Sequence, residues 1–176
     1  MAWVTEDRKQ EGLILEDTLV RNLSLPTVHK HRKAGIIDDN FLTKMSEKYI
    51  QKLKVKTTGG LQKAKNLSGG NQQKVVIAKW LETNADIFIM DEPTRGLDVG
   101  AKLEVYNIIN NLVSEGKAVI MVSSELPEVM GMSDRIIVMH EGYMAGEFKR
   151  DEVEREAIMM AASGGEQNDR YSNDNG

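Results

Sequence analysis

The clearest structural signal in the chain is Ile87-Phe88-Ile89-Met90-Asp91-Glu92-Pro93. Four apolar residues between polar turns predict a strand buried on both faces of a parallel sheet. Asp91 and Glu92 follow the strand directly, so we expect both carboxylates at the carboxyl edge of the sheet, where open α/β folds bind ligands. There Asp91 would hold Mg²⁺, usually through water, and Glu92 would orient or deprotonate a water that attacks a γ-phosphate. A plain acidic turn before Pro93 explains the same residues.

Strands and helices alternate on the carboxyl side of this stretch. Such alternation from residue 87 onward indicates an open α/β sheet, with no internal repeat. The expected elements are a helix over 99–114 stopped by Gly116, a second buried strand over 118–122, a third strand over 136–139 that turns back through 140–143 into a hairpin, a last helix over 151–162 and a disordered tail over 163–176.

The residues before Ile87 predict mainly helices. Apolar residues recur at three- and four-residue steps from Phe41 to Leu53, and Asp38 or Asp39 would cap that helix. Residues 1–7 are expected to be the tail of a strand that ends in a charged turn, and residues 18–28 to be mixed helix and turn ending at Pro26. A further helix is expected to follow the glycine pair Gly69-Gly70.

Composition excludes several classes of protein. The chain has 176 residues, a net charge of −4 and no cysteine, so disulfide scaffolds, thiolate zinc sites and cysteine nucleophiles are ruled out. Its apolar runs are far shorter than the roughly 18–20 residues of a membrane helix, and its first residues do not form a secretory signal, so we expect the chain to stay where it is made.

The charge is unevenly distributed along the chain. Residues 1–66 carry 13 Lys/Arg against 8 Asp/Glu, and the remainder is strongly acidic. The tightest basic run is His29-Lys30-His31-Arg32-Lys33, which either forms a solvated loop or binds phosphate. We favour the loop and expect no nucleic acid, because the run lacks interleaved aromatic residues for stacking. His29 and His31 have no third ligand nearby, which argues against a metal site.

A second chemical signal is Leu67-Ser68-Gly69-Gly70-Asn71-Gln72-Gln73. It combines a hydroxyl group, a glycine pair that allows close approach of backbone N–H groups, and the positive end of a helix. Together these suit a phosphate. The alternative is a glycine-rich start of a helix with no ligand.

Taken together, four segments resemble the ATP-binding cassette family of transport ATPases. In this resemblance Leu67–Gln72 corresponds to the signature loop, Ile87–Glu92 to the Walker B strand, Gly96-Leu97-Asp98 to the D-loop and Val122–Glu125 to the switch segment. Their order and approximate spacing are those of the family. The chain also resembles the second ATPase half of fused-cassette subunits that energise monosaccharide importers, especially those for ribose, over about residues 2–162. Four stretches carry this resemblance: Val4–Lys9, Leu67–Lys74, Asp91–Gly100 and Val122–Phe148.

The resemblance implies a fold and a set of site residues. The fold is a P-loop NTPase-like α/β cassette with a mainly parallel sheet, covering residues 1–162, with a helical subdomain at about 18–66 and the signature, Walker B and switch region at 67–162. Asp98 would couple two sites across a cassette dimer, and Ser124 replaces the switch histidine. Glu6 replaces a glutamine that follows the first subdomain. The residues expected to serve the ATP of a partner cassette are Ser68, Gly69, Gly70, Asn71 and Gln72.

One departure from the family pattern is large. The ATP-cradling motif G-x-x-x-x-G-K-[ST] occurs nowhere in the chain, so we expect the first strands and the Walker A loop to be lacking. The resemblance implies an ATPase that uses ATP and Mg²⁺, but we expect this chain alone to be inactive and to bind Mg-ATP weakly or not at all.

The implied partners are a second cassette, membrane permease subunits and, indirectly, a sugar-binding protein. The location would be the cytoplasmic side of the cell membrane, reached through the permease. Two alternatives are a non-catalytic partner that lends its signature loop to an intact cassette, and a soluble cassette ATPase of DNA repair or translation. The long coiled-coil or linker insertions typical of the last class are not present.

Overall fold

The structure is a computed structural model that describes residues 1–33 and 36–165. The chain divides into two compact units, residues 1–122 and residues 123–176. The four motifs therefore do not all belong to one unit: the signature loop, the Walker B strand and the D-loop lie in the first, whereas the switch segment crosses the boundary. Each unit is described by itself.

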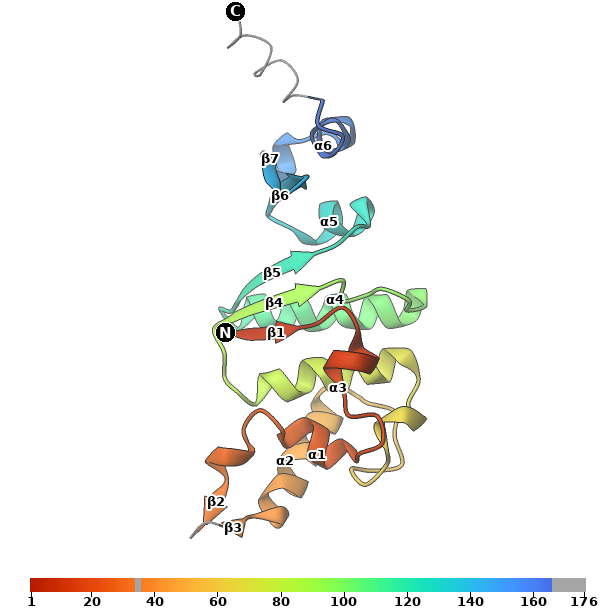
Figure 1. The fold of residues 1–176 in the computed structure, drawn as a ribbon, viewed down its shortest axis with the longest axis vertical. Helices are drawn as coiled ribbons and strands as arrows, with labels where there is room; N and C mark the ends of the chain where they lie inside the picture. The colour runs from red at the N-terminus through yellow and green to blue at the C-terminus, as the bar shows by residue number, and fades with distance from the viewer. Residues whose placement is uncertain (34–35, 166–176) are drawn as a thin grey trace, which may run out of the picture. The chain divides into compact units, whose positions relative to one another are not determined.

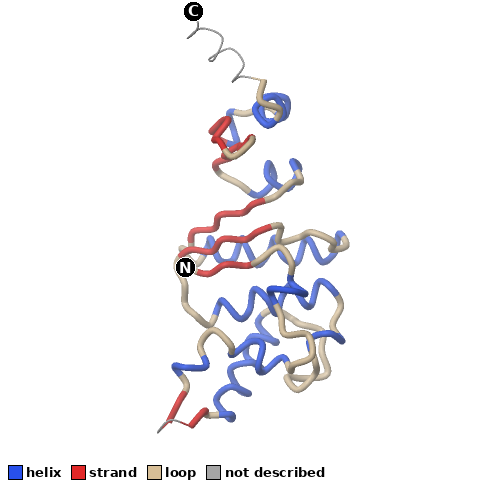
Figure 2. The backbone as a smooth tube through the Cα atoms, viewed as in Figure 1, coloured by secondary structure: helices blue, strands red, loops and turns tan. Residues whose placement is uncertain are grey.

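The first unit combines a small parallel sheet with helices (Figures 1 and 2). Its strands are β1 (Ala2–Val4), β2 (Arg32–Lys33), β3 (Ile36–Ile37), β4 (Ile87–Asp91) and β5 (Ala118–Val122). Its α-helices are α1 (Leu19–Ser24), α2 (Asp39–Lys52), α3 (Gly69–Leu81) and α4 (Val99–Ser114). Short π or 3₁₀ turns are η1 (Arg8–Gly12), η2 (Val28–Lys30) and η3 (Ala64–Asn66).

Three parallel strands form the sheet in the order β1-β4-β5. Figure 1 shows them side by side with their arrowheads pointing the same way. Helix α3 contacts β1 and helix α4 contacts β5. The predicted α/β fold with a parallel sheet is therefore confirmed, as are the helix over 99–114 and its end before Gly116, whose φ is +82°.

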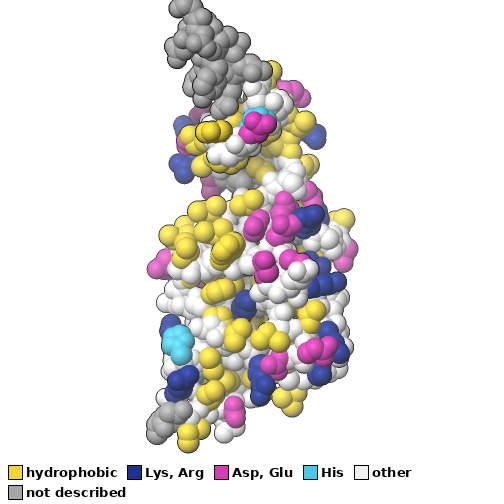
Figure 3. All heavy atoms as spheres, in the orientation of Figure 1, with side chains coloured by type: hydrophobic (Ala, Val, Ile, Leu, Met, Phe, Trp, Pro, Cys, Tyr) yellow, Lys and Arg dark blue, Asp and Glu magenta, His cyan; other side chains and the backbone are white. Residues whose placement is uncertain are grey.

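The two faces of this sheet differ in burial. On the inner face Val4, Phe88 and Met90 are at most 1% exposed. On the outer face Ile87 and Ile120 are exposed, and Figure 3 shows hydrophobic side chains gathered over β4 and β5. The prediction that both strands are buried on both faces is therefore wrong, because the helices of this unit cover one face.

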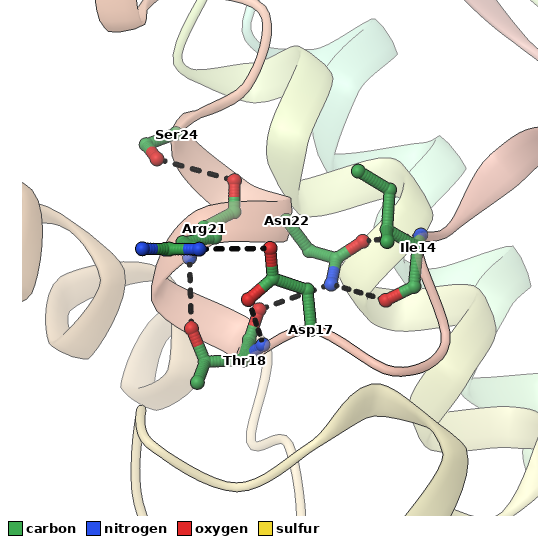
Figure 4. Close-up of polar contacts among 6 residues, drawn as sticks. All are labelled: Ile14, Asp17, Thr18, Arg21, Asn22 and Ser24. Carbon is green, nitrogen blue, oxygen red and sulfur yellow. Dashed lines mark hydrogen bonds and ion pairs between the residues drawn. The ribbon is translucent and has the colours of Figure 1, made fainter.

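The helices before α3 are held by side-chain caps and by a buried amide. Asp38 caps α2 by accepting from the Phe41 N–H at 3.0 Å, as predicted. Asn22, 1% exposed on α1, accepts from the Ile14 N–H at 2.8 Å and donates to the Ile14 and Thr18 carbonyls at 3.0 Å each (Figure 4). Asn22 therefore fixes α1 against the loop that follows η1.

The basic run at residues 29–33 is exposed at His29, Lys30 and Arg32, as expected of a solvated segment, but it has regular structure where we expected a loop. It forms η2 and the short strand β2, which pairs antiparallel with β3. The His31 ring stacks on Phe41 at 4.3 Å between ring centroids, and its Nε2 lies 3.7 Å from a Glu82 carboxylate oxygen. His31 is thus a packing residue, because α2 brings an aromatic ring against it.

The second unit is a hairpin with helices. Its elements are α5 (Leu126–Met132), β6 (Arg135–His140), β7 (Tyr143–Lys149), η4 (Arg150–Glu152) and α6 (Arg155–Ala162). Strands β6 and β7 pair antiparallel, and the predicted hairpin is confirmed. Its turn residues Glu141 and Gly142 both have positive φ, as a two-residue hairpin turn of type I′ requires.

Several predictions for this unit need correction. Residues 136–139 do not join the parallel sheet as a third strand, because β6 pairs only with β7 among the described strands. Its alternate side chains Ile136 and Val138 are buried with Ile158 and Ala161 in a separate small core. The last helix begins at Arg155 rather than residue 151, since η4 precedes it, and α5 was not anticipated. Ser163–Gly165 form a turn after α6, and the rest of the predicted tail lies outside the described residues.

Candidate functional site

The candidate site begins at the carboxyl end of β4. Asp91 is the last strand residue and pairs in register with Val122. Glu92 leaves the strand with φ +44°, a left-handed conformation that is uncommon for a residue with a side chain. Its N–H donates to the Val122 carbonyl at 2.9 Å. Both acidic residues are therefore at the edge of the sheet that their sequence position predicts.

The turn after Glu92 leads directly into α4. The Arg95 N–H donates to the Glu92 carbonyl and the Leu97 N–H to the Thr94 carbonyl, each at 3.1 Å. The Asp98 carboxylate then caps α4 by accepting from the Ala101 N–H at 2.9 Å. Asp98 thus has a local structural role as the N-cap residue of α4.

Asp91 and Glu92 at the carboxyl end of β4, called the acidic edge below, do not by themselves form a metal site. Within residues 1–33 and 36–165 no group of three or more His, Asp or Glu side chains could hold a metal ion. Asp91 supplies the hard carboxylate oxygen that Mg²⁺ prefers. Since Mg²⁺ is commonly held by one or two carboxylates together with phosphate and water, the donor set fits an ion that arrives with a nucleotide.

At the start of α3, the side chains of the signature loop bond within the protein. Ser68 is the N-cap residue, and its Oγ accepts from Asn71 Nδ2 at 2.8 Å. Asn71 Oδ1 in turn accepts from the Lys56 N–H at 2.8 Å. Gln72 is 4% exposed and donates to the Ala64 carbonyl at 3.1 Å. The Gln72 side chain therefore fixes η3 to α3.

The glycine pair has a packing reason that the sequence does not reveal. A Cβ on Gly70 would lie 2.7 Å from the Cβ of Ala101 on α4. A Cβ on Gly69 would lie 2.9 Å from Arg8 Nη2 and 3.6 Å from a methyl carbon of Leu97. Gly70 needs glycine because the start of α4 lies directly against the start of α3, whereas a Cβ on Gly69 would have to displace the end of the Arg8 side chain.

Two lysines further along α3 are buried and bonded. Lys74 is 3% exposed, donates to the Lys54 carbonyl at 3.1 Å and pairs with Glu104 of α4 at 2.8 Å. Lys79 donates to the Gly12 carbonyl at 2.5 Å, and burial lowers its pKa. Polar side chains thus tie α3 to the turn after α2, to α4 and to η1.

Glu6 and Arg8 connect the segment after β1 to the same region. Glu6 forms an ion pair with Arg95. Arg8 donates through Nη1 to the Arg95 carbonyl at 3.1 Å. Sequence reasoning placed Glu6 among the site residues but missed Arg8 and Arg95, because single charges in turns give no signal of a distant partner.

A basic cleft of about 390 Å³ opens beside the start of α3. Three cationic side chains contribute to its lining, and Lys65 among them pairs with Glu16 at 2.9 Å. Lys65 and Lys63 hold the pKa of the Glu16 carboxyl below its ordinary value. The lining residues are Arg8, Lys9, Leu15, Lys65, Leu67, Gly69, Gln72 and Gly96.

Ser124 belongs to the second unit, just before α5. Its neighbour Ser123 donates to the buried carboxylate of Glu128 and accepts from the Glu125 N–H at 3.1 Å. These bonds shape the chain on both sides of Ser124. The structure therefore groups Glu6, the signature loop, Asp91, Glu92 and Asp98 in one unit and Ser124 in the other.

Over residues 1–33 and 36–165, no helix is both long enough and apolar enough to cross a bilayer.

Acidic residues at the carboxyl edge of a parallel sheet, next to a glycine-led helix, define the ligand-binding edge of an open α/β fold. A family model described as ABC transporter matches residues 2–95, slightly more than half of the chain. The chain belongs to the ABC transporter family. The family that the four motifs indicate is therefore confirmed.

Curated relatives make the similarity more specific. The chain is 53% identical over 165 residues to "Xylose import ATP-binding protein XylG" of Thermoanaerobacter pseudethanolicus. It is 52% identical over 166 residues to "Ribose import ATP-binding protein RbsA" of Bacillus cereus. Each alignment covers 94% of this chain but 33% and 34% of the relative, so the chain spans about a third of the length of these relatives.

A solved structure gives the same fold. The chain is similar to an ATP-binding cassette, MJ0796, in a dimeric post-hydrolysis state bound to ADP and Pi. The TM-score is 0.71 at 26% identity, over 85% of this chain and 62% of that one. The α/β cassette fold expected from the resemblance is thus confirmed.

Proposed function

We propose that this chain is part of the energy-coupling ATPase subunit of a monosaccharide importer, for ribose or a related sugar such as xylose. The observation that carries the proposal is the identity of about half of its residues, over 94% of the chain, to import ATP-binding proteins for these two sugars. The positions of the acidic edge and the signature helix in one unit support it.

The acidic edge would carry the chemistry. When bound, Mg²⁺ neutralises charge on the nucleotide phosphates. Asp91 would hold that ion, together with phosphate and water. Glu92 would orient the attacking water and accept its proton. The left-handed backbone of Glu92, pinned to the Val122 carbonyl, supports a role that needs a fixed position.

The signature loop would serve a nucleotide held by a second cassette. Ser68, Gly69 and Gly70 begin α3, where backbone N–H groups and the helix dipole favour phosphate. Asn71 and Gln72 would act by holding that turn, since both side chains bond within the chain. Asp98 and Glu6 would link the loop region to the acidic edge through α4 and Arg95.

The partners would be a second cassette and the permease subunits of the importer, with a sugar-binding protein engaged through the permease. This chain would then lie at the inner face of the cell membrane, held there by the permease. Ser124 would contribute from the switch segment in place of a histidine.

The test is ATP hydrolysis and sugar uptake by an importer whose ATPase subunit contains this sequence as part of one of its cassettes. Glu92→Gln is expected to lower the ATPase rate by about 10²- to 10⁴-fold, the range for loss of a general base. Asp86→Asn, at the opposite end of β4, is the matched control and should leave the rate unchanged. Uptake of ribose and xylose, each with the other as competitor, identifies the sugar.

A second candidate function is a non-catalytic partner that lends its signature loop. It is favoured by one observation: the signature helix is complete, whereas the sequence has no G-x-x-x-x-G-K-[ST] motif. In that case Glu92→Gln would leave the ATPase rate intact while Gly70→Arg would abolish it. If neither variant changes hydrolysis, both candidates are wrong.

Nucleotide binding by the chain alone is a separate measurement. We expect purified chain to show weak or no binding of Mg-ATP in calorimetry, because no phosphate-gripping loop occurs in its sequence. A micromolar affinity would overturn this expectation.

A further inference from the structure

Arg8 lies between two loops that are distant in sequence. Its Nη1 donates to the Arg95 carbonyl at 3.1 Å, across 87 residues. Its Nη2 lies 2.9 Å from the point that a Cβ on Gly69 would occupy and 4.0 Å from that point for Gly96. The guanidinium group is therefore placed between the first turn of α3 and the turn before α4.

The backbone that carries Arg8 is itself fixed. The η1 turn packs on α3, where a Cβ on Gly12 would lie 3.0 Å from a Val76 methyl group. Lys79 donates to the Gly12 carbonyl at 2.5 Å. On the other side, Glu6 pairs with Arg95. Arg8 thus reaches out from an anchored segment.

The chemistry of the contact suits arginine. A guanidinium carries two terminal nitrogens in a fixed fork, so Nη2 can lie beside Gly69 while Nη1 donates to the Arg95 carbonyl. In the described part of the chain Arg8 Nε is buried without a hydrogen-bond partner. An unpaired buried donor is unfavourable, so the hydrogen bonds of the guanidinium do not by themselves explain where it lies. Its position is explained by the two loops between which it lies.

We propose that Arg8 is a positioning residue that holds the first turn of α3 and the turn Arg95–Leu97 in one arrangement. The signature loop and the D-loop then keep a fixed relation within one chain. The inference deepens the proposed function, on which its consequence for hydrolysis rests, because both loops would face the partner cassette.

The first test is hydrogen exchange of the 176-residue chain without nucleotide. Two amides report the two loops: the Gln72 N–H, bonded to the Ser68 carbonyl at 2.9 Å, and the Leu97 N–H, bonded to the Thr94 carbonyl at 3.1 Å. Arg8→Ala is expected to speed exchange of both by about fivefold, the effect of one lost hydrogen bond.

Conservative and control variants separate positioning from general stability. Arg8→Lys should restore protection at Leu97 more than at Gln72, since an ammonium can donate to the Arg95 carbonyl but has no second nitrogen to place beside Gly69. Lys9→Ala should change neither amide. Amides of β4 report any global loss of structure in Arg8→Ala. If such a loss occurs, exchange in Arg8→Lys is compared with exchange in the unchanged chain instead.

A double variant gives the sharpest result. Gly69→Ala places a Cβ against Nη2, so it should displace Arg8 and speed exchange at Leu97 as Arg8→Ala does. The double variant should add nothing to either single change. Additive effects, or unchanged exchange at either amide in Arg8→Ala, would overturn the proposal.

Hydrolysis is the second readout. In the assembled importer, Arg8→Ala should lower the maximal ATPase rate and Arg8→Lys should recover part of it. Because the exchange experiment contains no nucleotide, its outcome does not depend on the proposed function. If Arg8→Ala speeds exchange at both Gln72 and Leu97 but does not change hydrolysis, the positioning role is supported and the ATPase assignment is contradicted.

Discussion

Helix α3 and the outer face of the β1-β4-β5 sheet differ in how side-chain polarity relates to burial: α3 buries polar side chains, whereas the sheet exposes apolar ones. On α3 every residue from Gln72 to Lys79 is buried, including the charged Lys74. On the sheet, Trp3, Ile120 and Val122 are apolar yet 57%, 55% and 50% exposed. The contrast shows that the polarity of a side chain indicates whether burial is favourable for it. Whether it is buried is decided by the elements that pack around it.

The largest expected effect is on the free energy of unfolding, when a buried position and an exposed position of the sheet are each truncated to alanine. Phe88→Ala should lower the free energy of unfolding by about 3–5 kcal/mol, because Phe88 is 1% exposed on the inner face. Ile120→Ala on the outer face should cost less than about 1 kcal/mol. Urea unfolding followed by tryptophan fluorescence measures both, since Trp3 and Trp80 lie in the first unit. Equal losses would contradict the contrast.

The second prediction concerns close packing at the start of α3. Gly70→Ala should cost about 1–3 kcal/mol through overpacking against Ala101. Ala101→Gly removes the opposing methyl group, so the double variant should recover part of the loss beyond additivity. The same unfolding experiment reports it. Strictly additive losses would show that the two helices separate instead of clashing.

The third prediction uses the buried ammonium of Lys79. Burial lowers its pKa in the folded chain, so the unfolded chain binds more protons as the pH approaches 10.5, the ordinary value. Stability should therefore rise with pH from the folded pKa up to about 10.5. Lys79→Met should lose this rise, whereas the exposed Lys44→Met should keep it. Urea midpoints across that pH range test the sign.

The smallest effect is expected at the exposed start of the sheet. Asp86 accepts from Lys117 at 3.0 Å, and this pairing lowers its pKa. The stabilisation is present above pH 3.8 and is lost as the pH falls through the folded pKa. Asp86→Asn should lower the thermal midpoint only slightly at pH 7, because exposed ion pairs contribute little. The wild-type and variant midpoints should converge in acid.

Much of the fold was predictable because local patterns are strong where elements are long. Residues 99–114, the Asp38 cap and the strand that ends in Asp91 follow directly from periodicity and turn chemistry. The strand over 136–139 and its hairpin were predicted correctly, but its place in the parallel sheet was not, because a short apolar run does not say which sheet it joins. Pairing depends on the nearby turn at Glu141-Gly142, which makes a hairpin available at once.

The site was predictable as a set of positions but not as a set of contacts. Asp91, Glu92 and Asp98 lie where their place after a strand or before a helix requires. Gln72 was expected beside a nucleotide, yet its side chain bonds to the Ala64 carbonyl. A side chain on a helix can face either solvent or a neighbour, and only the neighbour's position decides.

The amino-acid sequence was sufficient for the α/β class, for the order of four cassette motifs and for the absence of a P-loop motif, since each depends on residues close together in the chain. Only the tertiary structure reveals that Arg8 lies against Gly69 and Arg95, that Gly70 must clear Ala101, and that the sheet is covered on one face. These contacts join residues up to 87 positions apart. Their existence is decided by how the helices pack, which no local pattern encodes.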